Sequence, residues 1–92
     1  MIAVKVRFFA YFRELFGASN IAAELPDGSK IGDLLDKLCD TPERKSEIFS
    51  GPKLKNHVVV MINGRPVDPR RGLEEPLHDG DVAAVFPFLG GG

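Results

Sequence analysis

The residues with the most distinctive chemistry stand at the carboxyl end of the chain, where Gly90, Gly91 and Gly92 follow Leu89. Because glycine has no side chain, such a run can thread a channel too narrow for other residues. The terminal carboxylate of Gly92 is then a group that another protein can activate. Ordering three glycines costs about 3–6 kcal/mol, so we expect a docking surface elsewhere on the chain that offsets this cost. The alternative is a floppy tail without a role.

Conventional catalytic groups are sparse in the rest of the sequence. His57 and His78 have no cysteine or carboxylate at metal-ligand spacing, so we expect no metal site. Residues 79–81 are interpreted as a turn, because the ligand series of a calcium loop does not follow them. Cys39 continues the apolar stripe of a predicted helix and is interpreted as a packing residue rather than a nucleophile. We therefore expect a protein that is not an enzyme and binds no cofactor itself.

Two phenylalanines are the candidates for the docking surface. Phe9 lies on the solvent-facing parity at the end of the first predicted strand, and Phe86 lies on the solvent-facing parity of the last one. If these two strands are neighbours, the two rings meet close to the tail. Phe88 and Leu89, two large apolar residues directly before the glycines, extend the same surface. The alternative is that Phe9 and Phe86 are simply core residues.

The periodicity of apolar residues predicts the elements of the first half of the chain. Residues 2–8 alternate between apolar and polar types, which is typical of a strand with one buried face. Apolar residues at helical spacing predict a short helix over residues 12–16, and a second strand follows over residues 20–25. Ser29 is the expected N-cap of the main helix over residues 31–39, whose apolar stripe has i, i+3, i+4, i+7 spacing.

In the second half, residues 40–57 are polar and broken by prolines and glycines, so we expect a loop region with one helical turn that ends at residues 48–49. Residues 57–62 are apolar and β-branched and predict a strand. The Asn63-Gly64 pair predicts a type I′ hairpin turn. Because Pro66 lacks an N–H, the returning strand is expected to be short or at an edge.

The last predicted strand, residues 81–86, is apolar on both parities, which is typical of the centre of a sheet. One main helix must then cover one face of a mixed four- to five-stranded sheet, which predicts an α+β fold in two layers. A chain of 92 residues supports one hydrophobic core. We therefore expect a single domain over residues 1–89 and a flexible tail over residues 90–92.

Composition narrows the classes of partner and the location. The formal net charge is −1, which disfavours nucleic acid and anionic membranes as partners. One cysteine permits no internal disulfide and favours a reducing compartment. Because the sequence shows neither a signal peptide nor a run of about 20 apolar residues, we expect a cytoplasmic location.

The ordered set of segments resembles the MoaD/ThiS family of ubiquitin-like sulfur carriers, and the MoaD-like members most of all. The resemblance spans nearly the whole chain and implies the β-grasp fold. The segments that carry it are Val6-Arg7-Phe8-Phe9-Ala10, Arg13-Glu14-Leu15, Gly17, Met61-Ile62-Asn63-Gly64, Leu77, Asp79-Gly80-Asp81, Phe86-Pro87 and Gly91-Gly92. The family ends in two glycines, whereas three follow Leu89 here.

This resemblance implies partners and a chemistry. An ATP-dependent E1-like adenylating enzyme of the MoeB/ThiF type would adenylate the Gly92 carboxylate, and sulfur would then open the anhydride to leave a thiocarboxylate. A MoaE-type large synthase subunit would use that sulfur to build molybdopterin. Family members carry apolar surface residues at the positions of Phe9 and Phe86, and at a third position that is Pro66 here. Three alternatives stay open: sulfur for cysteine, thiamin or tRNA thiolation; a modifier conjugated to lysines; and an interaction module with an inert tail.

Overall fold

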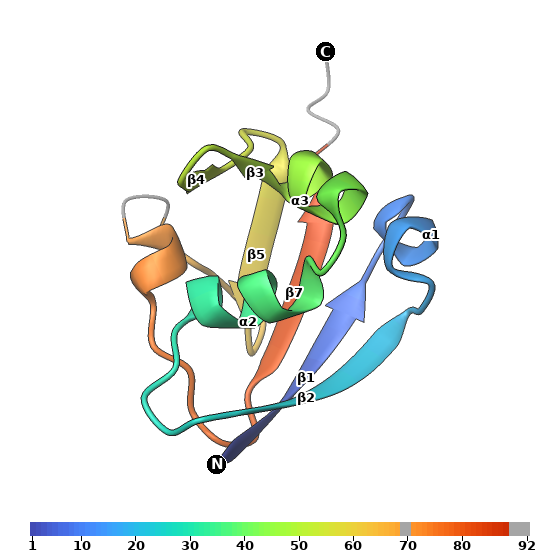
Figure 1. Cartoon of the computed structure of the whole chain (residues 1–92). Coiled ribbons are helices and arrows are strands. Elements are labelled where there is room, and N and C mark those ends of the chain that lie inside the picture. The colour runs from blue at the N-terminus through green and yellow to red at the C-terminus, as the bar shows by residue number, and fades with distance from the viewer. Residues whose placement is uncertain (69–70, 89–92) are drawn as a thin grey trace.

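A five-stranded mixed sheet forms the centre of the protein (Figure 1), whose computed structural model describes residues 1–68 and 71–88. In spatial order the strands are β2 (Asn20–Leu25), β1 (Ile2–Phe8), β7 (Val82–Pro87), β5 (Val58–Ile62) and β6 (Arg65–Pro66). β1 and β7 run parallel, and the other neighbouring strands are antiparallel. The predicted α+β fold, with its first and last strands adjacent, is confirmed.

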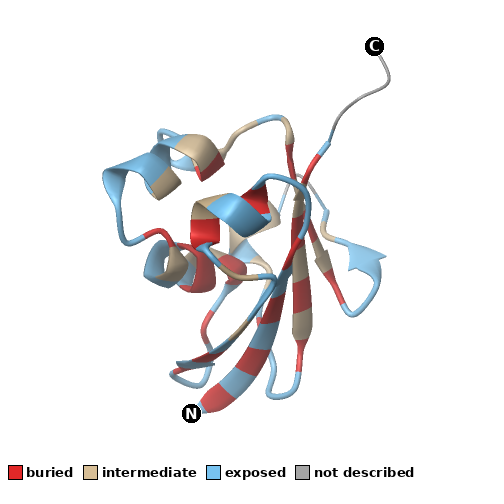
Figure 2. Ribbon diagram, turned by 90° about the vertical axis from the view of Figure 1, so that its right-hand side faces the viewer, coloured by how far each residue is buried: buried red, intermediate tan, exposed pale blue. Residues whose placement is uncertain are grey.

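The alternation of residue types in β1 separates the two faces of the sheet. Buried and exposed residues alternate along the whole strand (Figure 2), with Val4, Val6 and Phe8 on the buried side. Lys5 and Arg7 lie on the opposite, open face of the sheet. β7 lies between β1 and β5, so its backbone is paired on both edges, as its apolar composition predicts.

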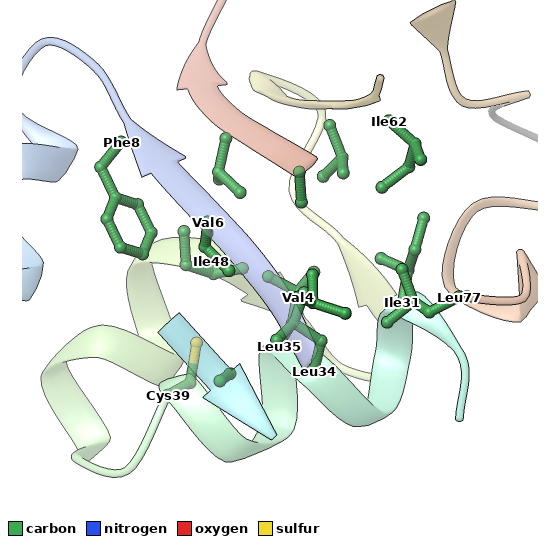
Figure 3. Close-up of a cluster of buried hydrophobic side chains, with 14 of the residues drawn as sticks. Val4, Val6, Phe8, Ile31, Leu34, Leu35, Cys39, Ile48, Ile62 and Leu77 are labelled. Atoms are coloured by element: carbon green, nitrogen blue, oxygen red, sulfur yellow. The ribbon is translucent and has the colours of Figure 1, made fainter. Parts of the chain in front are cut away.

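Three short helices lie on the side of the sheet that carries the buried residues. α2 (Ile31–Leu38) directs Ile31, Leu34 and Leu35 into the core (Figure 3), where they meet Val4 and Val6 of β1. α1 (Phe12–Phe16) ends at Gly17, whose φ of 70° forms a left-handed C-cap. The structure also contains α3 (Pro42–Ile48), the two-residue strands β3 (Phe49–Ser50) and β4 (Lys53–Leu54), and the 3-10 helix η1 (Gly72–Glu74).

The main helix begins at residue 31, as predicted, but its predicted N-cap was wrong by one residue. Lys30, not Ser29, is the N-cap of α2, and Asp33 accepts a hydrogen bond from the Lys30 amide at 2.8 Å. The Ser29 hydroxyl instead donates to the Pro26 carbonyl at 2.7 Å. The Ser29 carbonyl accepts a hydrogen bond from the Leu77 amide. Ser29 therefore belongs to the turn before α2 and joins that turn to the segment around Leu77.

The interpretation of residues 40–57 as a loop with one helical turn was incomplete, because this stretch contains α3 and a small antiparallel hairpin of β3 and β4. Thr41 caps α3 by accepting a hydrogen bond from the Arg44 amide, and Pro42 occupies the first turn, where its missing N–H is harmless. The helix delivers Ile48 into the core with 0% exposure. A polar stretch thus supplies one of the best-buried residues of the domain.

The hairpin between β5 and β6 matches its prediction. Asn63 and Gly64 both have positive φ, at 51° and 79°, as a type I′ turn requires. β6 has two residues, includes Pro66 and lies at the edge of the sheet, as expected. Within residues 1–68 and 71–88, no helix has the length and apolar character that crossing a membrane requires.

Candidate functional site

The base of the predicted tail lies where β7 ends, beside the start of β5. The amide of Phe88 donates to the carbonyl of His57, which ties the end of β7 to its neighbour. The Phe88 side chain is 61% exposed, in keeping with its predicted place on a docking surface. Leu89 and residues 90–92, which the sequence analysis placed at the site, lie outside the described residues.

Phe9 and Phe86 meet at this end of the sheet, as predicted. Their ring centroids are 6.1 Å apart with an interplanar angle of 88°, an edge-to-face contact. The backbone places them together because β1 runs parallel to β7 and the Phe9 amide donates to the Val85 carbonyl. Phe9 is 40% exposed, Phe86 is half-buried, and neither belongs to the buried core.

The aromatic pair continues into an apolar strip across the open face of the sheet. Val59 of β5 is the direct neighbour of Phe86, and Met61 lies two residues further along the same face. Met61 is paired in turn with Pro66 of β6, which places that proline on the open face as well. We call Phe9, Phe86, Val59, Met61 and Pro66 the apolar strip. Of these residues, only Phe9 and Phe86 were predicted to lie on a docking surface without the help of the family resemblance.

A polar contact beside the tail base was missed by the sequence analysis. The Tyr11 hydroxyl and His57 Nε2 form a hydrogen bond of 2.9 Å, which joins the start of α1 to the start of β5. Partial burial raises the pKa of the Tyr11 phenol, with a smaller contribution from the Glu47 carboxylate, so the hydroxyl keeps its proton. Ala10, which links β1 to α1, has an unusual φ of 55°. The partners are 46 residues apart in sequence, so no local pattern reveals their contact.

The groups at the other end of the sheet have structural roles. Asp81 is 8% exposed and accepts hydrogen bonds from the Asn63 side-chain amide and the His78 backbone amide. This network joins the start of β7 to the hairpin turn, so residues 79–81 belong to a turn, as interpreted. Among the described residues, no group of three or more His, Cys, Asp or Glu side chains could hold a metal ion.

Cys39 is a packing residue, as predicted. It is 6% exposed and belongs to the core at the C-terminal end of α2 (Figure 3). Burial raises the pKa of its thiol to about 11, so only a very small fraction is the reactive thiolate at neutral pH. The arrangement of the described residues therefore offers a binding surface at the tail base rather than an assembled active site.

The chain is similar in sequence and in fold to proteins of one known family. The model of the ThiS family matches residues 6–92. Small archaeal modifier protein 3 of Haloferax volcanii is 36% identical over 90 residues, which cover 97% of this chain and 98% of that protein. The molybdopterin synthase sulfur carrier subunit of Chlamydomonas reinhardtii is 34% identical over 92 residues, with coverage of 97% and 98%. The solution structure of the Haloferax volcanii HVO 2177 protein superimposes with a TM-score of 0.85 at 35% identity, over 99% of this chain and 87% of that one.

Proposed function

The chain belongs to the ThiS family, and we propose that it works as a sulfur carrier through the backbone carboxylate of Gly92. The expected MoaD/ThiS relationship and the ubiquitin-like β-grasp fold are confirmed. Proteins of this family are small carriers and modifiers rather than enzymes, so the chain is a protein on which other proteins act. The recipient of the sulfur that we propose is molybdopterin.

The observation that carries the proposal is the position of the aromatic pair. Phe86 lies near the end of β7 with the Phe9 ring against it, and exposed Phe88 is the first residue after the strand, ahead of the glycines. A partner that docks on these rings can hold the last strand while the glycines extend from it. Aromatic side chains are efficient anchors because they bury a large area at a low cost in conformational entropy.

The proposed chemistry has three steps, in which partner proteins act on the Gly92 carboxylate. An E1-like enzyme of the MoeB/ThiF type joins the Gly92 carboxylate to the α-phosphate of ATP, which releases pyrophosphate and leaves an acyl adenylate. Sulfide, or a persulfide together with a reductant, attacks the acyl carbon, so AMP leaves and a thiocarboxylate remains. A large synthase subunit of the MoaE type then accepts the sulfur. The name of the Chlamydomonas relative, a sulfur carrier subunit of molybdopterin synthase, supports this acceptor.

A second candidate is a protein modifier that forms isopeptide bonds with lysines. The similarity to small archaeal modifier protein 3 favours it. Both candidates share the acyl adenylate and differ in the nucleophile, which is sulfur for the carrier and a lysine amine for the modifier. Transfer of sulfur to cysteine, thiamin or tRNA would use the same thiocarboxylate with another acceptor.

Intact-protein mass spectrometry tests the proposal. After incubation with the cognate adenylating enzyme, ATP and sulfide, we expect the mass change of exchanging one oxygen for sulfur, located at Gly92. A Cys39→Ser variant controls for sulfur added to the thiol, which would increase the mass by a whole sulfur atom instead. A residue appended after Gly92 should abolish the exchange and leave the fold intact. Continued sulfur delivery by this blocked protein would overturn the proposal.

Two further measurements separate the candidates. A molybdopterin-deficient host that lacks its own small subunit should recover cofactor synthesis if this chain carries sulfur for that pathway. Reductant-resistant conjugates of higher mass that contain an isopeptide bond at Gly92, without such recovery, would favour the modifier. Deletion of Gly92 alone restores the two-glycine end of the family. Whether the shortened protein still acquires sulfur shows which tail length the adenylating enzyme accepts.

A further inference from the structure

One edge of the sheet is open and lies away from the tail base. β2 is the outermost strand on its side of the sheet (Figure 1). The Phe8 amide donates to the Ser19 carbonyl, and the register with β1 then alternates along the strand. In an antiparallel pair, every second residue turns its backbone groups toward the partner strand and the others turn them away. The amides of Asn20, Ala22 and Glu24 therefore point outward.

The open edge has few of the usual features that prevent strand addition, and Glu24 is the one charged residue of β2. β2 contains neither lysine nor proline, and it has no bulge in its register with β1. Natural sheets commonly protect an exposed edge with such features. β6, at the opposite edge, is two residues long and includes Pro66. The structure thus protects one edge and leaves a six-residue strand available at the other. The Glu24 carbonyl is the exception, because Lys37 Nζ donates to it at 2.7 Å.

A cationic hollow adjoins this edge on the open face of the sheet. Its volume is about 430 Å³, and it is lined by Lys5, Arg7, Asn20, Ile21, Ala22 and Val82. Lys5 is paired in register with Ala22, and Arg7 with Asn20, so both cations lie one strand in from the edge. Within residues 1–68 and 71–88, no ion pair joins Lys5 or Arg7 to a carboxylate. Both charges are thus available to a ligand.

From the edge and the hollow together, we infer that β2 receives an extended acidic segment of a partner protein as an additional strand. The segment hydrogen-bonds to the outward amides of β2, as in other cases of strand addition. Its acidic side chains on the open face reach over Ala22, whose small side chain leaves room, to Lys5 and Arg7. Its alternate residues face the helix side, next to half-buried Ile21, where apolar side chains fit best. This surface is separate from the tail and does not depend on the proposed sulfur chemistry.

A synthetic peptide tests the inference with the full-length protein. The probe is a capped heptapeptide of alternating valine and glutamate, titrated into ¹⁵N-labelled protein and followed by NMR. We expect saturable shifts of the Asn20, Ala22 and Glu24 amides and slower hydrogen exchange at these positions. A peptide with lysine in place of glutamate, and one N-methylated on the bonds that face β2, should each fail to bind. Equal binding of either control peptide would overturn the inference.

Substitutions on the protein give the matching control. Lys5→Ala combined with Arg7→Ala removes two exposed charge contacts and should weaken the glutamate peptide roughly tenfold. Lys53→Ala combined with Arg65→Ala removes two exposed cations elsewhere and should leave the affinity unchanged. Unchanged binding to the first variant, shifts confined to the apolar strip, or displacement of the peptide by equimolar inorganic phosphate would each overturn the inference.

Discussion

Two adjacent phenylalanines, Phe8 at the end of β1 and Phe9 directly after it, allow a matched test of the docking surface. Phe8 is 1% exposed and stacks on Phe16 with ring centroids 4.2 Å apart, whereas Phe9 is 40% exposed and forms an edge-to-face contact with Phe86. Phe8→Ala removes a fully packed ring and leaves a cavity, so it should lower the free energy of unfolding by about 3–5 kcal/mol. Phe9→Ala leaves no cavity and loses only part of a side chain's burial, about 1–2 kcal/mol.

The two substitutions should affect partner binding in the opposite order, with Phe9→Ala causing the larger loss of affinity. If Phe9 is an anchor for the adenylating enzyme, Phe9→Ala should weaken binding by about 2 kcal/mol or more, roughly thirtyfold in Kd. Urea unfolding measures the first quantity, and a titration with the enzyme, monitored by calorimetry, measures the second. For Phe8→Ala, any loss of binding should follow the fraction of protein that is unfolded.

Two results would refute this reasoning. If Phe9→Ala lowers the free energy of unfolding as much as Phe8→Ala, then Phe9 contributes to the core despite its exposure. If Phe9→Ala leaves both stability and binding nearly unchanged, the aromatic pair is not the anchor. In that case the enzyme must recognise another part of the open face, and Met61 is the next residue to change.

Three further predictions concern stability. Ala10→Gly should raise the free energy of unfolding by roughly 0.5–1 kcal/mol in urea unfolding, because glycine tolerates the φ of 55°; a lower midpoint would contradict this. The Cys39 thiol has a pKa raised to about 11 by burial, against 9.0 in its ordinary state. Its contribution to stability is therefore present below pH 9 and falls by about 1.4 kcal/mol per pH unit toward pH 11. A Cys39→Ala variant measured in parallel should lack this component. Asp81→Ala should destabilise by about 1–3 kcal/mol, since it leaves the Asn63 amide without its buried acceptor.

Much of the sheet could be predicted from the sequence because strand periodicity is local information. The alternation in β1 gives its buried face, the apolar composition of β7 gives its central place, and the Asn63-Gly64 pair gives the hairpin. The Phe9–Phe86 contact followed from these elements, since parity and strand adjacency together determine which side chains meet.

The features that sequence reasoning missed depend on contacts between distant segments. Ser29 has the right type for an N-cap, but the Leu77 amide donates to its carbonyl, and the N-cap is the next residue, Lys30. Gly32 looks unfavourable within a helix, yet a Cβ there would lie 3.2 Å from Leu73 of η1. Glycine at this position costs about 1 kcal/mol in helix propensity. Because it has no Cβ, it allows α2 and η1 to pack closely. Neither contact has a signal in local periodicity.

The two proposed surfaces share one strand, and this has a consequence for how partners combine. Lys5 and Arg7 lie on the open face of β1, and Phe9 follows directly after the strand on the same side, about 13 Å from Lys5 at the usual rise of a strand. The Arg7 guanidinium lies 5.7 Å from the centre of the Phe9 ring, so the same side chain borders both the cationic hollow and the aromatic pair. A segment paired with β2 draws Arg7 toward its carboxylates and away from Phe9, which uncovers more of the ring.

The acidic peptide should therefore alter the affinity of the adenylating enzyme, and by reciprocity the enzyme should alter the affinity of the peptide by the same factor. In Arg7→Ala this coupling should vanish while each surface remains. Coupling that persists in that variant would mean that the two surfaces communicate by another route, or that the partners touch each other.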